Sequence, residues 1–222
     1  MRYNKFYFWF LVYILIGTGI FLFWGNIYYP LRYRATAQFT ENKINVLGEP
    51  LQEKTNKEAF EFKNRNGEKV AIIPVAVYDI SAKVVINERY PNFWNVAELD
   101  NLLTNDLVLV WGKLFENRYL KKIKFSHQWS YMTFKYADEK LNHEPGYEYI
   151  SNHVSSNHLI AANKNVDHAL RQLQRNDVVR IKGYLINIQI PDKPLVQTSI
   201  TRTDNWRQGE GNTGGSEFIY VI

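Results

Sequence analysis

The sequence predicts an α+β protein that is mainly β, with an N-terminal transmembrane helix followed by one strand-rich domain. Three observations carry this prediction. The nineteen residues from Phe6 to Trp24 contain no charge. Many short apolar or alternating runs follow residue 58, and only one later segment has a convincing helical period. Such a pattern is typical of a strand-rich domain with one packed helix, and a small curled barrel is one form that the strands could take.

The run from Phe6 to Trp24 is predicted to cross a membrane. As a helix it would span about 28 Å, close to the ~30 Å hydrocarbon thickness of a bilayer. It is longer than the apolar part of a secretory signal, and no small-residue cleavage motif follows it, so residues 1–30 are expected to stay as an anchor. Arg2 and Lys5 lie directly before the run, which favours a cytoplasmic N-terminus and an extracytoplasmic domain.

The composition excludes several classes of protein. With 45% hydrophobic and 22% charged residues, the chain is not disordered throughout. The absence of cysteine excludes disulfides, thiolate metal sites and cysteine nucleophiles. The net charge of +5 falls to +3 without the two cations beside the anchor, because 25 basic residues then face 22 acidic ones. That excess is too small to indicate nucleic acid. The lysines at 121, 122 and 124 are typical of a solvated face, and binding of lipid headgroups or nucleic acid by these lysines is the weaker alternative.

Residues 31–58 are predicted to be a polar spacer that separates the anchor from a domain of residues 59–222. The spacer contains Gly48 and Pro50 and lacks a sustained apolar period, although a short strand near residues 44–47 is an open alternative. Beyond it, Asn66-Gly67 between two apolar runs predicts a tight hairpin. Pro74 lacks a ladder donor, so the second strand of this hairpin is expected to lie at an edge or to break there.

The remaining elements follow from local patterns. Residues 163–175 predict a helix, because Val166, Ala169, Leu170 and Leu173 recur at helical spacing and Asn163 or Asn165 can cap its start. A short helix or turn is expected over 91–104 and a loop over 137–147. Strands are expected at 79–87, 106–112, 119–125, 128–136, 178–190 with a bend or bulge at Gly183, 198–202 and 217–222.

Four sequence blocks suggest a relationship. DLVLVWG, SSNHLIAAN, NDVVRIKGYL and TSITRTD, in this order within about residues 70–222, resemble a family of uncharacterised bacterial proteins with one N-terminal membrane segment and a β-rich C-terminal domain. The resemblance implies a single-pass protein of the bacterial inner membrane and implies no activity. Asn176-Asp177 stands where this family tends to have Gly-Asp, and residues 205–215 look like an insertion before the last strand.

Polar residues of these blocks form the candidate binding site, a shared cluster of Asn157, His158, Arg202, Asp204 and Glu217. An arginine can bind a carboxylate or phosphate through two hydrogen bonds, while pairing of Arg202 with Asp204 or Glu217 is the purely structural alternative. We therefore predict a membrane-anchored binding or assembly module of an envelope complex. Its expected partners are the lipid bilayer and an envelope protein, without nucleic acid, cofactor or metal.

An enzyme is the alternative prediction. Ser156, His158 and Asp204 provide the residue types of a hydrolase or of a metal-assisted enzyme. Against this, no G-x-S-x-G motif surrounds the serine, and the histidine spacing matches no helical metal-ligand pair.

Overall fold

The computed structural model describes residues 3–23, 44–89, 98–128, 131–138, 144–199 and 216–222, and the chain forms two compact units, Met1–Lys43 and Ile44–Ile222. In the first unit, helix α1 (Tyr3–Phe23) coincides with the predicted apolar helix. Its side chains at Trp9, Tyr13 and Leu15 are exposed. Among the described residues, no helix has the length and apolarity needed to cross a membrane.

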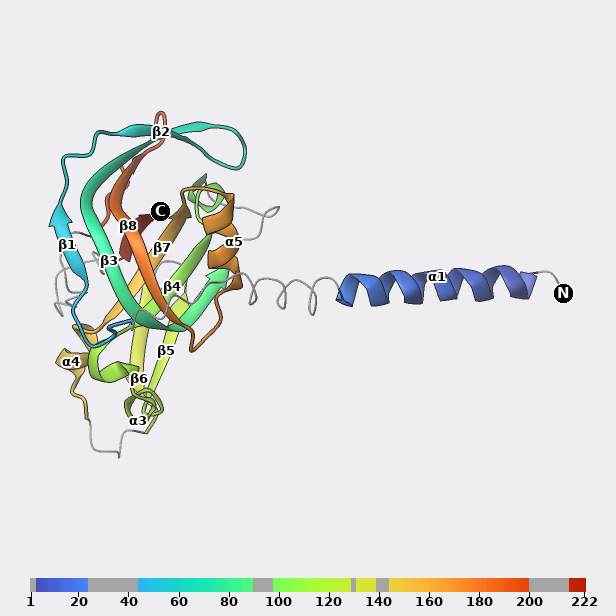
Figure 1. Cartoon of the computed structure of the whole chain (residues 1–222), viewed down its shortest axis with the longest axis horizontal. Helices are drawn as coiled ribbons and strands as arrows, with labels where there is room; N and C mark the ends of the chain where they lie inside the picture. Colours follow the sequence, from blue (N-terminus) through green and yellow to red (C-terminus); the bar gives the residue numbers. More distant parts are fainter. Residues whose placement is uncertain (1–2, 24–43, 90–97, 129–130, 139–143, 200–215) are drawn as a thin grey trace. The chain divides into compact units, whose positions relative to one another are not determined.

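The second unit is rich in strands, as predicted. Seven strands share one sheet in the order β1-β3-β4-β7-β9-β8, with β2 also paired to β3, and β5-β6 form a separate hairpin (Figure 1). A further ladder between β3 and β8 joins the two ends of the run β3-β4-β7-β9-β8. The strands are β1 (Leu51–Lys54), β2 (Phe60–Lys63), β3 (Lys69–Arg89), β4 (Asn105–Val110), β5 (Ile123–Gln128), β6 (Tyr131–Tyr136), β7 (Val154–Ala161), β8 (Val178–Gln189) and β9 (Ser216–Val221). The helical segments are η2 (Glu98–Asn101), η3 (Gly112–Phe115), α3 (Asn117–Leu120), α4 (Tyr147–Ser151) and α5 (Lys164–Gln172).

Strand β3 is the longest strand and corrects one expectation. The predicted hairpin with β2 is confirmed, and Gly67 in its turn has a φ of +83°, a conformation that glycine adopts without strain. At Pro74, however, the strand neither ends nor lies at an edge, because β8 pairs with β3 from Ala71 to Lys83. A register shift between Pro74 and Ala76 accommodates the residue that lacks an N–H donor. The expected strand at 79–87 is therefore the second half of β3.

Most of residues 44–58, predicted as spacer, belong to the strand-rich unit. Strand β1 pairs with β3 over Leu51–Lys54, and Val46 and Pro50 are buried. The Val46 carbonyl accepts a hydrogen bond from Gly112 N at 2.8 Å, and the Glu49 carboxylate accepts one from Trp111 Nε1 at 3.2 Å. These contacts are made to residues more than fifty positions away, so local composition could not predict them.

The core consists of three apolar clusters. The first lies among β3, β4, β7, β8 and β9 and includes Tyr78, Leu107 and Leu159. The second lies beneath the β5-β6 hairpin, which was predicted correctly as two strands, and the third is lined by β2, β3 and β8. Full burial of a large apolar side chain contributes about 1.5–3 kcal/mol, so these clusters hold the strands in place.

Helix α5 confirms the one helix expected in the domain. The Asn163 side chain accepts hydrogen bonds from the backbone N–H groups of Asn165 and Val166, and Leu170 packs into the first cluster. At Gly183 the ladder with β3 shows no register shift, so the expected bulge is absent there. A Cβ atom at this position would collide with the carbonyl of Tyr220 on β9, so the glycine permits close approach of two strands. Of the strand expected at 198–202, the first two residues are irregular and the rest lie outside the described residues, as do residues 91–97.

Candidate functional site

Strand β7 places four polar residues, Ser155 to His158, in the centre of the sheet. It pairs with β4 on one side and with β9 on the other, and all four residues are at most 4% exposed. Polar side chains are rarely buried without hydrogen-bond partners. Because successive side chains of a strand alternate between faces, Ser155 and Asn157 lie on one face and Ser156 and His158 on the other.

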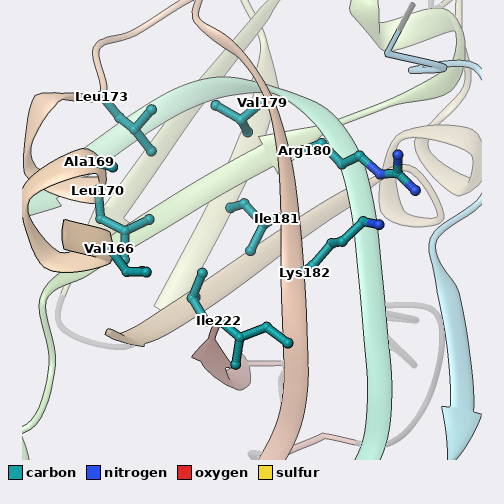
Figure 2. A pocket seen from close by; sticks show the side chains of 10 residues that line it. Val166, Ala169, Leu170, Leu173, Val179, Arg180, Ile181, Lys182 and Ile222 are labelled. Carbon is teal, nitrogen blue, oxygen red and sulfur yellow. The ribbon is translucent and has the colours of Figure 1, made fainter. Parts of the chain in front are cut away.

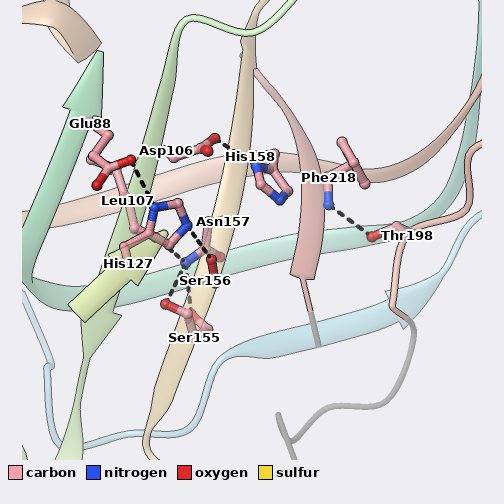
Figure 3. Close-up of polar contacts among 10 residues, drawn as sticks. All are labelled: Glu88, Asp106, Leu107, His127, Ser155, Ser156, Asn157, His158, Thr198 and Phe218. Atoms are coloured by element: carbon pink, nitrogen blue, oxygen red, sulfur yellow. Dashed lines mark hydrogen bonds and ion pairs between the residues drawn. The ribbon is translucent and has the colours of Figure 1, made fainter. Parts of the chain in front are cut away.

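His158 forms a buried pair with Asp106, its register neighbour on β4. The distance from His158 Nδ1 to Asp106 Oδ1 is 2.6 Å, and the side chains are 3% and 2% exposed (Figure 3). The imidazole stacks on Phe218 of β9 with a centroid distance of 4.8 Å. Its second nitrogen, Nε2, is buried and has no hydrogen-bond partner among the described residues. Asp106 thus fixes the orientation of the ring.

Ser156 lies on the same face and joins a second set of contacts. Its Oγ is 3.3 Å from Nε2 of His127 on β5, and His127 Nδ1 is 2.9 Å from the Glu88 carboxylate on β3 (Figure 3). The connectivity is that of a serine-histidine-acid triad. The His127 side chain is only 1% exposed, whereas that of Glu88 is 48% exposed. In this arrangement the serine hydroxyl is therefore shielded, and the acid is the solvent-facing member.

The opposite face of β7 holds a buried polar group around Asn157 and Glu217. Asn157 Nδ2 donates to Ser155 Oγ at 2.8 Å and to the Leu107 carbonyl at 3.2 Å, while its Oδ1 has no partner among the described residues. Glu217, the register neighbour of Asn157 on β9, accepts a hydrogen bond from the Tyr78 hydroxyl at 3.3 Å. Burial raises the pKa of Glu217 to about 8, against a smaller lowering by that hydrogen bond.

The candidate cluster predicted from sequence is only partly assembled. Asn157 and Glu217 are neighbours, but His158 points to the other face of the sheet, so the expectation of one shared cluster is wrong for this residue. Arg202 and Asp204 lie outside the described residues, and so do their predicted pairings. Ser156 contacts His127 rather than His158, which also corrects the serine-histidine pair of the enzyme alternative.

Sequence reasoning missed four partners: Tyr78, Glu88, Asp106 and His127. Asp106 reaches its partner through the pairing of β4 with β7, whereas the other three contacts join strands that are not paired with each other. The contacts span 29 to 139 positions in the chain, so no local pattern predicts them. Strand β7, whose alternation separates Asn157 from His158, was not predicted from the sequence. Within the described part of the chain, no group of three or more histidine, aspartate or glutamate side chains is arranged to hold a metal ion.

A groove of about 330 Å³ lies elsewhere, between α5 and β8 (Figure 2). Leu170 and Leu173 line it from the helix, and Val179 and Ile181 line it from the strand. Arg180 on β8 instead binds Asp79 of β3 through two hydrogen bonds of 2.9 and 2.8 Å. The groove therefore offers apolar contact without a free charged group of its own at this position.

Comparison with known proteins identifies no relative: no family model, no curated protein and no solved structure matches the chain. The resemblance to the bacterial family with one N-terminal membrane segment accordingly stays a prediction.

Proposed function

We propose that this chain is a single-pass, membrane-anchored binding or assembly module of a bacterial envelope complex. The uncharged run from Phe6 to Trp24 supports the anchor, because nineteen residues at about 1.5 Å of helical rise each would extend about 28 Å. Arg2 and Lys5 before the run support a cytoplasmic N-terminus, with the strand-rich unit on the extracytoplasmic side of the inner membrane.

We further propose that the strands β3, β4, β7, β9 and β8 form a small closed barrel. Numbered by their order in the chain, β3, β4, β7, β8 and β9 are strands one to five. Their order around the proposed barrel is one, two, three, five, four, and the β3–β8 ladder between strands one and four closes the ring. Strands three and five are parallel, and α5 lies between strands three and four. This is the plan of the oligonucleotide- and oligosaccharide-binding fold, in which ligands contact the face of strands two and three. The analogy concerns the fold and supports a place for binding rather than a ligand.

The observation that carries the proposal is that His158 Nε2 has no hydrogen-bond partner within the described part of the chain. It lies on the face of strands two and three, held by Asp106 and stacked on Phe218. A buried polar atom without a partner costs about 1–3 kcal/mol, and a group from a binding partner would remove that cost. Because Nδ1 contacts Asp106, Nε2 is the ring atom that remains for a polar group of the partner.

Site-specific photocrosslinking tests this proposal. A benzophenone amino acid replaces Phe218 in the full chain in living cells, and a matched variant carries it at Lys193, an exposed residue in the turn after β8. We expect a discrete adduct from position 218 that is lost in the His158→Gln background and absent from position 193. Adducts that are identical at both positions, or an adduct at 218 unaffected by His158→Gln, would contradict this binding face.

Hydrolysis is the second candidate, favoured by the Ser156–His127–Glu88 contacts. The serine is 4% exposed, so a substrate would have to displace the covering hairpin to reach its hydroxyl. A fluorophosphonate probe should label the full chain and spare Ser156→Ala if this candidate is correct. Equal labelling of the two proteins, or none, would exclude an active serine at this position.

A further inference from the structure

The β5-β6 hairpin carries an uncompensated pair of lysines on its outer face. Lys124 and Lys135 are register neighbours across the two strands, and both are exposed. Like charges directly opposite each other in an antiparallel ladder are destabilising. The inner face of the hairpin is fixed, because Ile123, Met132 and Tyr136 are buried in the second core cluster. The hairpin therefore presents its lysines from a rigid base.

Two more lysines lie in the turn that leads into the hairpin. Lys121 and Lys122 follow α3, and the Lys122 carbonyl accepts a hydrogen bond from Ala137 N at 2.7 Å, which holds this turn against the end of β6. Within the described residues, none of these four lysines forms an ion pair, whereas Lys69 pairs with Glu61 and Arg180 with Asp79. We call Lys121, Lys122, Lys124 and Lys135 the lysine face.

The lysine face lies at the end of the unit where its chain begins. Val46 is bonded to Gly112 at the start of η3, and η3 is followed directly by α3 and the lysine face. The elements α3, α4 and β5-β6 gather at one end of the unit (Figure 1). Tyr147 of α4, which packs on Tyr136 with a centroid distance of 4.9 Å, is 53% exposed. Tyr136 belongs to the inner face of the hairpin, so Tyr147 is not part of the lysine face. Lysine side chains by themselves can keep their charged groups at a membrane interface while their apolar stems lie on a surface.

We propose that the lysine face binds the anionic lipid headgroups of the membrane that holds the anchor. The inference rests on the proposed anchorage and adds a second membrane contact, made by the folded unit itself. Each lysine near an anionic bilayer contributes enough attraction to change binding about fivefold. The contact should weaken at high salt, because surface charges are screened over about a Debye length.

Lysine footprinting on the full chain tests the proposal. The protein is reconstituted in nanodiscs of phosphatidylcholine alone or of equal parts phosphatidylcholine and phosphatidylglycerol, and acetylation of each lysine is followed by mass spectrometry. We expect acetylation of the lysine face to slow about fivefold in the anionic discs and to recover at high salt, with Lys69 and Lys193 unchanged. The double variant Lys124→Gln/Lys135→Gln should remove the protection of Lys121, whereas Lys69→Gln/Lys193→Gln should keep it.

The outcomes separate this inference from the anchor. If the chain does not copurify with either kind of disc, the proposed anchorage is wrong and the inference falls with it. If the chain copurifies but the lysine face reacts equally in both discs, the anchorage stands and this inference is wrong. Protection by added RNA but not by phosphatidylglycerol would instead assign the face to nucleic acid and overturn the lipid proposal.

Discussion

Replacing Glu217 by glutamine should make the strand-rich unit more stable at neutral pH. The carboxyl group is 2% exposed, and its pKa is raised from 4.5 to about 8 in the folded chain by burial. Between these values the unfolded chain releases the proton while the folded chain keeps it, so the stability contribution present below pH 4.5 is lost as pH rises through 8. Each pH unit between the two pKa values lowers the free energy of unfolding by about 1.4 kcal/mol, so at pH 7 the folded chain has lost about 3 kcal/mol of stability.

Glutamine retains the size of the side chain and its hydrogen-bonding capacity but cannot ionise. Glu217→Gln should therefore match the wild type near pH 4.5 and exceed it by an amount that grows towards pH 8. Urea unfolding of both full-length proteins in mild detergent, followed by tryptophan fluorescence at several pH values, measures this difference. Glu53→Gln, at an exposed position of β1, is the matched control and should run parallel to the wild type. A Glu217→Gln difference that is constant with pH would refute a neutral carboxyl group in the fold.

Three further predictions concern single contacts. Gly183→Ala should destabilise the unit severely, because its Cβ would collide with the Tyr220 carbonyl; the urea midpoint should fall by more than that of any exposed substitution. Asn163→Ala should cost about 1 kcal/mol, since the side chain caps α5 through two backbone N–H groups, and thermal unfolding should show this loss. Asp106→Asn should release the fixed orientation of His158 and cost about 1–3 kcal/mol, with the change seen as a shift of the imidazole resonances in NMR spectra.

The elements that sequence patterns predicted are those fixed by neighbouring residues. The Asn66-Gly67 hairpin and the capped helix α5 depend on turn chemistry and on helical spacing, and both are confirmed. The prediction that the strand ends or lies at an edge at Pro74 was wrong, because it considered only the missing N–H donor. The pairing with β8, which accommodates Pro74 through a register shift, could not be predicted from local sequence. The docking of Glu49 on Trp111 likewise depends on residues distant in sequence. Local sequence preferences therefore determine which secondary-structure elements form, and strand pairing determines how far each strand extends.

The candidate site was harder to predict because it depends on strand register and on how the separate β5-β6 hairpin packs. His158 lies opposite Asp106 only in one alignment of β7 with β4, and a shift by one residue would send its ring to the other face. The sequence does contain one usable signal. Four consecutive polar residues in a strand that ends in apolar ones predict polar groups on both faces, and hence two separate sets of partners instead of one.

The two unpartnered atoms of β7 differ in what can reach them. Asn157 Oδ1 lies on the face shared with Tyr78 and Glu217, among side chains that are at most 2% exposed. Burial raises the pKa of the neighbouring Glu217, which makes this face a determinant of stability and of its pH dependence. His158 Nε2 lies on the opposite face beside Phe218, which is only half-buried. Substitutions at Asn157 or Glu217 should therefore change the free energy of unfolding more than the crosslinking yield at position 218. Substitution of His158 should change the crosslinking yield more than the free energy of unfolding.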